Sequence, residues 1–333
     1  ITGKIELDGK PISGNFLTTF YLELAEKNRL DIKEANARNV VVLLSERNKY
    51  NPVEHYLNGC NDPLPKDTWN NIAFHIFGSK NPQHSVHFQR QMIAAVARTY
   101  KQPCKVDTAL ILQSDTQGEG KEAIWEALGG EWYCSSLGSI GGNNHKDTLI
   151  TLHSAWFHNW GEIDRIMGMQ SSENIKHFMS EQRDNFRYPH ERTNSLKDRK
   201  CILVGTTNKR NFINDPTGNR RFPIISTNRI NAEWVLEHRD QIFASAKNDY
   251  LDGVRWWYDK KEIVDLNNHA MQFAAHDPLL DEMEEALDTY KRDDICIRVV
   301  VDLLNEGLIA SEKKEKAKAV QTVKDLIQTY DIS

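Results

Sequence analysis

The chain has 333 residues, 39% of them hydrophobic and 27% charged, and its formal net charge is −5. A chain of this length normally forms two or three domains, each with its own core. No apolar run approaches the roughly 18 residues of a membrane-spanning helix, and the five scattered cysteines include no CxxC pair, which excludes a transmembrane helix, a disulfide framework and a zinc signature. We therefore expect a cytoplasmic protein without a membrane partner.

The N-terminal third of the chain is predicted to be helical. Apolar residues recur there at spacings of three and four between residues 15 and 99. We expect a helical N-terminal domain over residues 1–104. The first residue is Ile1 rather than a methionine, and we expect the chain to be part of a longer protein.

Short apolar runs of strand length begin after residue 107. They cover residues 109–112, 155–160, 201–204 and 222–225, and helical patterns over 122–128 and 173–179 lie between them. Strands that alternate with helices are typical of a parallel sheet covered on both faces. The sequence therefore predicts an α/β core over residues 105–230, and the loop that follows its first strand makes it a core of the P-loop type.

The chain returns to a helical pattern from residue 232. We expect a helical extension over residues 231–290 and a small C-terminal unit over residues 291–333. The pattern of that last unit, with a break at Gly307, fits a helix-turn-helix or winged-helix unit. A helical cap packed on the core fits it equally well.

A phosphate-binding loop is predicted directly after the first strand. The segment Ser114–Glu122 joins that strand to a helix, as in loops whose backbone N–H groups cradle phosphates while a lysine reaches the β- and γ-phosphates. The match to G-x-x-x-x-G-K-[ST] is incomplete, because Asp115 stands at the first glycine and Glu122 at the hydroxyl position. The predicted nucleotide-binding residues are Thr116, Gln117, Gly118, Glu119, Gly120, Lys121 and Glu122.

Polar or charged residues lie at the ends of three further predicted strands. Glu162 follows the second apolar run, Asn208 follows the third, and Arg220 and Arg221 directly precede the fourth. Phosphoryl transfer needs a phosphate cradle, an acid that orients water, a polar sensor and a cation for the transition state. All four types occur, so we predict that these four residues are catalytic.

A basic segment begins after Glu162, includes the third apolar run and ends just beyond Asn208. Residues 183–210 contain eight basic and three acidic residues, a local charge of +5 (8 − 3), whereas the acidic surplus of the chain lies after residue 240. Basic residues interleaved with aromatic ones suit single-stranded nucleic acid, and a solvated loop is the plainer alternative. The candidate nucleic-acid-binding residues are Arg183, Arg187, Tyr188, Arg192 and Lys197.

Two other groups of residues are given structural roles. We expect His145, His153 and His158 to be surface or hydrogen-bonded residues rather than metal ligands, because no matching cysteine or carboxylate spacing accompanies them. Six tryptophans in mostly apolar surroundings are predicted to pack in the core rather than to stack on bases. They are Trp125, Trp132, Trp156, Trp160, Trp256 and Trp257.

Several segments resemble the virulence-associated protein E (VapE) family of phage, plasmid and pathogenicity-island proteins, which is related to superfamily 3 helicases and more distantly to AAA+ ATPases. The most specific are DPTGNRRF at 215–222 and VGTTN at 204–208, and residues 51–57, 94–98, 127–133 and 156–162 also match. The resemblance covers about residues 45–265 and implies a superfamily 3 helicase-like fold.

The resemblance implies an ATPase that assembles into a hexamer-like homo-oligomeric ring. It implies ATP and Mg²⁺ as cofactors, single-stranded or forked DNA as a partner, and a primase or other replication protein as a further partner. Such proteins serve the replication of a phage or other mobile element in the cytoplasm of a bacterium or an infected host.

Residue by residue, the resemblance implies that Lys121 binds phosphate, Glu162 polarises water and Asn208 is the sensor. Arg220 or Arg221 is implied to be a finger that enters the site of a neighbouring subunit. The basic segment is implied to lie near the ring pore, where related helicases contact DNA.

The sequence departs from the family at the two positions that hold magnesium. Glu122 replaces the hydroxyl residue after Lys121, and Asn159 replaces the carboxylate three residues before Glu162. One hypothesis is an exchange, in which Glu122 supplies the carboxylate and Asn159 a neutral oxygen. The other is decay, because two like charges about 4 Å apart repel by about 4 kcal/mol at an effective dielectric near 20. The extra charge of Asp115 favours decay.

Two functions from different classes remain open on the sequence. The first is an ATP-dependent, DNA-translocating helicase-type ATPase for replication of a mobile element. The alternative is a degenerate P-loop scaffold with weak or no hydrolysis that binds DNA or a host protein. The first has a variant, in which the chain is the ATPase end of a primase–helicase polypeptide.

Overall fold

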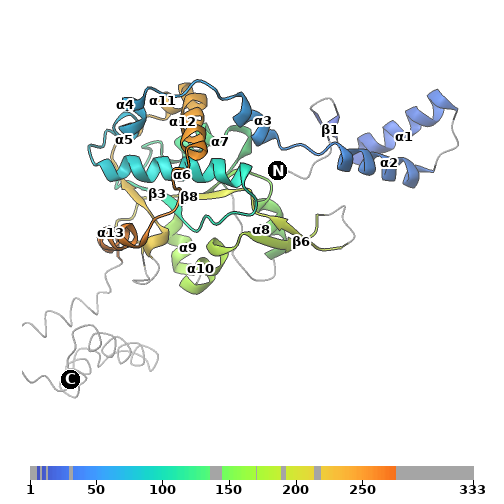
Figure 1. Cartoon of the computed structure of the whole chain (residues 1–333). Coiled ribbons are helices and arrows are strands. Elements are labelled where there is room, and N and C mark those ends of the chain that lie inside the picture. The colour runs from blue at the N-terminus through green and yellow to red at the C-terminus, as the bar shows by residue number, and fades with distance from the viewer. Residues whose placement is uncertain are drawn as a thin grey trace, which may run out of the picture. The chain divides into compact units, whose positions relative to one another are not determined.

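The computed structural model describes residues 6–7, 10–12, 14–29, 33–135, 145–169, 171–188, 193–213 and 219–274 (Figure 1). The chain divides into two compact units, Ile1–Ala274 and Ala275–Ser333, and the second lies outside the described residues. The predicted C-terminal unit over 291–333, residues 275–290 of the predicted extension, and Arg192 also fall outside them. None of the described helices is both long enough and apolar enough to cross a membrane.

Short strands and helices make up the first hundred residues. In chain order they are β1 (Glu6–Leu7), β2 (Lys10–Pro11), α1 (Gly14–Asn28), α2 (Glu34–Arg47), α3 (Pro52–Gly59), α4 (Lys66–Asn70), α5 (Ile72–Phe77) and α6 (Pro82–Tyr100). Helix α6 begins sharply, because the side chain of Asn81 accepts a hydrogen bond from the backbone N–H of Gln83 at 3.0 Å and Pro82 occupies the first turn. It is buried along most of its length and packs on the central parallel sheet.

A five-stranded, fully parallel sheet forms the centre of the fold, with strand order β4–β5–β8–β3–β9. Its strands are β3 (Ala109–Gln113), β4 (Tyr133–Cys134), β5 (Phe157–Trp160), β8 (Ile202–Thr207) and β9 (Ile224–Ser226). The central strands β3 and β8 are buried at every position, as expected of continuous apolar runs in a covered parallel sheet. The predicted α/β class is confirmed, and four of the five strands coincide with the predicted runs.

Helices cover both faces of the sheet (Figure 1). Leu110 and Leu112 of β3 share one core with α3, α5, α6, α7 and α12, whereas Ala109 and Ile111 share a second core with α8, α10 and α13. The remaining elements are α7 (Lys121–Gly129), η1 (Gly130–Trp132), α8 (His145–Leu152), α9 (Ile163–Met169), α10 (Ser172–Ser180), β6 (Arg183–Phe186), β7 (Ser195–Asp198), η2 (Asn219–Arg221), α11 (Ala232–Glu237), α12 (Arg239–Leu251) and α13 (Lys260–Met271).

Four of the six tryptophans predicted for the core are buried there: Trp125, Trp132, Trp156 and Trp160. The prediction is wrong for Trp257, which is 48% exposed, and Trp256 is half-buried. Both residues lie in the loop between α12 and α13, so the apolar residues that suggested burial belong to no strand or helix.

Candidate nucleotide-binding site

The carboxyl ends of three adjacent strands bring together residues that are far apart in the sequence. Strand β8 lies between β5 and β3, and Gln113 is paired with Thr207 at the end of the sheet. Since all three strands are parallel, the phosphate loop after β3, Glu162 after β5 and Asn208 after β8 emerge at the same edge. Ligands of open α/β sheets bind at this edge.

Two glycines shape the loop between β3 and α7. Gly118 and Gly120 have φ values of 81° and 80°, in the left-handed region that other residues rarely adopt. Gly120 is the residue that precedes the first turn of α7, so the free backbone N–H groups of that helix point into the loop. Thr116 Oγ1 donates a hydrogen bond to Glu119 Oε1 at 2.6 Å and closes the loop on itself.

Lys121 lies at the centre of this edge. Its side chain crosses to the next strand, where Nζ donates hydrogen bonds to Asn208 Oδ1 at 2.6 Å and to the carbonyl oxygen of Thr116 at 2.8 Å. Burial lowers the pKa of Lys121, and the charges of Glu119 and Glu122 oppose that shift. The predicted phosphate-binding lysine and the predicted sensor are therefore in direct contact.

Glu162 follows β5 and is exposed at the same edge of the sheet. Its backbone has φ of 52°, in the left-handed region that a residue with a side chain rarely adopts. The carboxylate accepts a hydrogen bond from Arg165 Nη1 at 2.9 Å, and both side chains are mostly exposed. The carboxylate is thus open to water.

Asp164 is a site residue that the sequence did not indicate. Its Oδ1 accepts a hydrogen bond from Thr207 Oγ1 at 3.0 Å, and Lys209 Nζ lies 2.8 Å from its Oδ2. Burial alone would raise the pKa of Asp164, but the hydrogen bonds from Lys209 and Thr207 hold it below its usual value. The contact ties the first turn of α9 to the end of β8, on either side of Asn208.

The two departures from the family pattern lie close together. The alternation of β5 places Phe157 and Asn159 on the face covered by α7, whose first turn carries Glu122. A Cβ atom added at Gly161 would lie only 3.1 Å from Glu122 Oε1, so the carboxylate reaches the end of β5. Asn159 Nδ2 donates a hydrogen bond to the hydroxyl oxygen of Tyr133 at 3.1 Å.

The oxygen of Asn159 provides a test of whether this position fits a metal ion. Asn159 is 1% exposed, and among the described residues its Oδ1 has no hydrogen-bond partner. A buried acceptor without a donor is costly unless a ligand or ion satisfies it. An amide oxygen, one carboxylate and waters are a donor set that suits Mg²⁺, so the residues present fit the ion.

Arg220 and Arg221 lie on the opposite edge of the sheet. Helix η2 directly precedes β9, and β9 is parallel to β3, so both arginines are at the amino ends of the strands. Arg220 is exposed, and Arg221 Nη2 donates a hydrogen bond to Ser180 Oγ at 3.3 Å. Within one chain the structure therefore does not bring these arginines to Lys121.

The four described candidate nucleic-acid-binding residues lie on or next to an antiparallel hairpin of β6 and β7. Arg183 and Lys197 are on the strands, and the exposed Arg187 and half-buried Tyr188 follow β6 at its tip. Lys197 Nζ lies 4.9 Å from the centroid of the Tyr188 ring. The hairpin thus groups basic and aromatic side chains on one projecting element.

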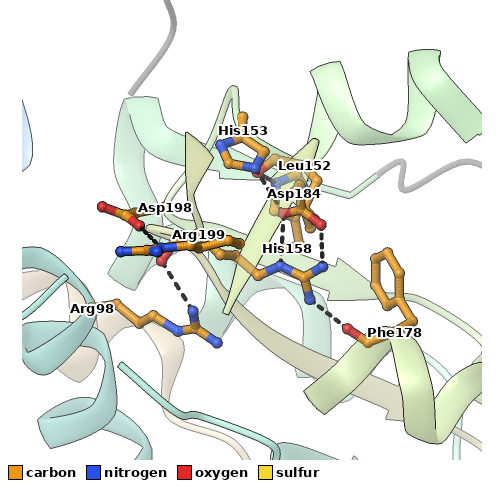
Figure 2. Close-up of polar contacts among 9 residues, drawn as sticks. Arg98, Leu152, His153, His158, Phe178, Asp184, Asp198 and Arg199 are labelled. Carbon is orange, nitrogen blue, oxygen red and sulfur yellow. Dashed lines mark hydrogen bonds and ion pairs between the residues drawn. The ribbon is translucent and has the colours of Figure 1, made fainter. Parts of the chain in front are cut away.

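A buried ion pair anchors this hairpin to the core (Figure 2). The Asp184 carboxylate lies between the Arg199 guanidinium, with nitrogen–oxygen distances of 2.6 and 3.0 Å, and His153 Nε2 at 2.8 Å. Burial alone would raise the pKa of Asp184, but the hydrogen bonds from His153 and Arg199 bring it well below its usual range. Arg98 Nη1 donates to the carbonyl oxygen of Arg199 at 3.0 Å.

The anchor takes one of the eight basic residues of 183–210 out of contact with solvent. Arg199 is 2% exposed and structural, because a buried charge needs a partner of opposite sign. His153 and His158 are buried and hydrogen-bonded as expected, His153 to Asp184 and His158 Nε2 to the carbonyl oxygen of Leu152 at 2.8 Å.

Comparison with solved structures gives distant similarities. The C-terminal region of NrS-1 (305–718) is 13% identical with a TM-score of 0.46, and the match covers 83% of this chain and 66%, less than two thirds, of that one. A JCV helicase bound to a substituted acetamide is 11% identical with a TM-score of 0.32, covering 82% and 84%. Among curated proteins, none matches the chain.

The sequence also matches a protein-family model. The model is that of the virulence-associated protein E-like domain, and it matches residues 58–275. This region is more than half of the chain and contains the phosphate loop, the whole parallel sheet and both arginines. The chain therefore belongs to the virulence-associated protein E-like domain family.

Proposed function

We propose that this chain is an ATP-dependent, helicase-type ATPase that moves along single-stranded or forked DNA during replication of a phage or other mobile element. The observation that carries the proposal is the 2.6 Å contact between Lys121 Nζ and Asn208 Oδ1 beneath the first turn of α7. It joins a phosphate-binding lysine to a strand-end amide at a helix N-terminus, where the helix dipole favours anions. Membership of the family supports the same function.

Each residue of this edge has a defined task in the proposed reaction. The backbone N–H groups that open α7 and the ammonium of Lys121 bind the β- and γ-phosphates. Asn208 donates its amide to the γ-phosphate, and the exposed carboxylate of Glu162 orients the attacking water. Glu122 and Asn159 would hold Mg²⁺, which when bound would supply positive charge against the phosphate oxygens.

The first test of the proposal is ATP hydrolysis by the unaltered chain, measured as phosphate release with Mg²⁺ and with or without single-stranded DNA. We expect hydrolysis, and we expect DNA to increase its rate. DNA binding without any nucleotide binding would contradict the proposal and would indicate the alternative function, a DNA-binding scaffold.

The position of the arginines supports a ring. At the Lys121 edge, the other described cations are already paired with acids: Arg165 with Glu162, Lys209 with Asp164 and Arg210 with Asp115. Exposed Arg220 lies at the opposite edge of the same sheet and has no ion pair among the described residues. If copies associate with one edge against the other, each arginine edge faces the phosphate loop of a neighbour. We therefore propose a hexamer-like homo-oligomer in which every site is shared by two chains.

Mixing two inactive variants should restore activity in such an assembly. Lys121→Ala chains lack the phosphate lysine but keep the arginines, and Arg220→Ala/Arg221→Ala chains have the reverse defect. In an equal mixture with random order, one contact in four (1/2 × 1/2) joins two intact halves, so about a quarter of the normal hydrolysis should return. A mixture of Lys121→Ala with the Lys121→Ala/Arg220→Ala/Arg221→Ala chain is the matched control and should stay inactive. Absence of any recovery would contradict a shared site.

A further inference from the structure

A pocket of about 460 Å³ lies at the amino ends of the strands, on the edge of the sheet opposite to Lys121. Its walls include the segment that leads into β3, the arginines of η2 and the loop between α12 and α13. The volume is in the range of small-molecule sites, roughly 300–1,000 Å³. Because the pocket and Lys121 lie at opposite edges of the sheet, the pocket is separate from the proposed ATP site of the same chain.

The walls of the pocket are strongly basic. They carry Lys101, Lys105, Arg220 and Arg221 against the single acid Asp107, a local charge of +3 (4 − 1) in a chain whose net charge is −5. Asp107 neutralises only Lys105, whose Nζ lies 3.3 Å from its Oδ2. Among the described residues, nothing forms an ion pair with the exposed Arg220. This wall can therefore take an anion.

A second part of the pocket wall is aromatic. Trp256 Nε1 donates a hydrogen bond to the carbonyl oxygen of Lys105 at 3.0 Å, which fixes the indole against the basic segment. Trp257 stands at 87° to it, with ring centroids 4.9 Å apart, and remains 48% exposed. A large exposed indole next to several cations is an unusual surface, because it leaves apolar area in water beside groups that attract phosphate.

We propose that this pocket binds a nucleotide unit, with the base stacked on Trp257 and the phosphate paired with Lys101, whose Nζ lies 5.8 Å from the centroid of the Trp256 ring. An acidic peptide would satisfy the cations and leave Trp257 in water, and an apolar peptide would do the reverse. A planar base joined to a phosphate uses both walls at once. The unit belongs either to a DNA strand or to a free nucleotide, and this proposal does not depend on ATP hydrolysis at Lys121.

The proposal is tested in the Lys121→Ala chain, where the phosphate loop is disabled. Fluorescence anisotropy compares three probes: labelled dT10, a labelled decamer of abasic sites with the same charge, and a fluorescent ADP. We expect Trp257→Ala to weaken binding of dT10 or of ADP by roughly fivefold or more, the low end of base stacking. Binding of the abasic decamer should not change with Trp257→Ala, whereas Lys101→Ala should weaken it.

Two controls separate stacking from general damage. Phe74→Ala removes another aromatic side chain of similar exposure, 52%, and should leave all three affinities unchanged. Trp257→Phe keeps an aromatic face and should restore most of the lost affinity. A loss confined to dT10 assigns the pocket to a DNA strand, and a loss confined to ADP assigns it to free nucleotide.

Three results would overturn the proposal. They are an equal loss for dT10 and the abasic decamer on Trp257→Ala, no effect of that substitution on either base-containing probe, and competition by a polyglutamate peptide as strong as that by unlabelled dT10.

Discussion

Replacing Lys121 with alanine should lower ATP hydrolysis by about 100-fold or more and abolish tight nucleotide binding. The ammonium is buried and already oriented by Asn208 Oδ1 and the Thr116 carbonyl oxygen, so it meets the phosphates without rearrangement. Removing one such oriented donor from a transition state typically costs 10²–10³ in rate. Phosphate release and the affinity for a fluorescent ATP measure the effect.

The control for this prediction is an exposed lysine at the same sheet edge. Lys209 is 67% exposed and pairs with Asp164 rather than with the loop, so Lys209→Ala should keep most of the hydrolysis. Thermal unfolding of both variants shows whether the chain is still folded. If Lys121→Ala hydrolyses ATP at the normal rate, the nucleotide site lies elsewhere.

The second large effect concerns Glu122 and Asn159. The structure places the Glu122 carboxylate at the end of β5 and leaves Asn159 Oδ1 buried without a partner among the described residues. We therefore expect the exchange hypothesis to hold, with the negative charge of the metal site moved from β5 to α7. Tyr133 keeps the amide oriented, because its hydroxyl accepts the hydrogen bond from Nδ2 and leaves the oxygen free.

Glu122→Gln should weaken Mg²⁺-dependent ADP binding at least about tenfold, since even an outer-sphere partner of a metal is typically worth 10–100-fold. Adding Asn159→Asp to that variant should restore affinity, because the charge returns on the neighbouring strand. Calorimetric titration of ADP at several Mg²⁺ concentrations measures both.

The opposite exchange distinguishes the two hypotheses. Glu122→Ser with Asn159→Glu rebuilds the family pattern, so it should leave hydrolysis little improved if the present pair already holds magnesium. A large gain in hydrolysis would indicate decay of the natural site.

The sequence was sufficient to predict the local units of the site. A buried run followed by glycines, a lysine and a helix predicted β3, the loop and α7, since chain neighbours alone define that unit. Glu162 and Asn208 were predicted for the same reason, because each comes shortly after a predicted strand. The parallel sheet followed from alternation of strands and helices, and it is the sheet that brings these residues to one edge.

What the sequence left open depends on contacts between distant elements. A basic residue looks the same in sequence whether it is exposed or paired, so Arg199 gave no sign of its buried contact with Asp184, which needs the hairpin to fold back. Asp164 was missed because its partner Thr207 lies 43 residues away. Trp257 was wrongly predicted to be buried, because an apolar pair in a loop resembles the end of a buried run.

Strand β8 joins two parts of the molecule with different tasks. It begins shortly after Arg199, which anchors the basic hairpin, and it ends one residue before Asn208, which contacts Lys121. All six residues are buried, and residues 202–205 pair with β5 while residues 203–207 pair with β3, so the register of the strand is set on both sides. At about 3.3 Å per residue it spans roughly 20 Å. The distance between the hairpin base and the phosphate loop is therefore fixed by the length of one strand.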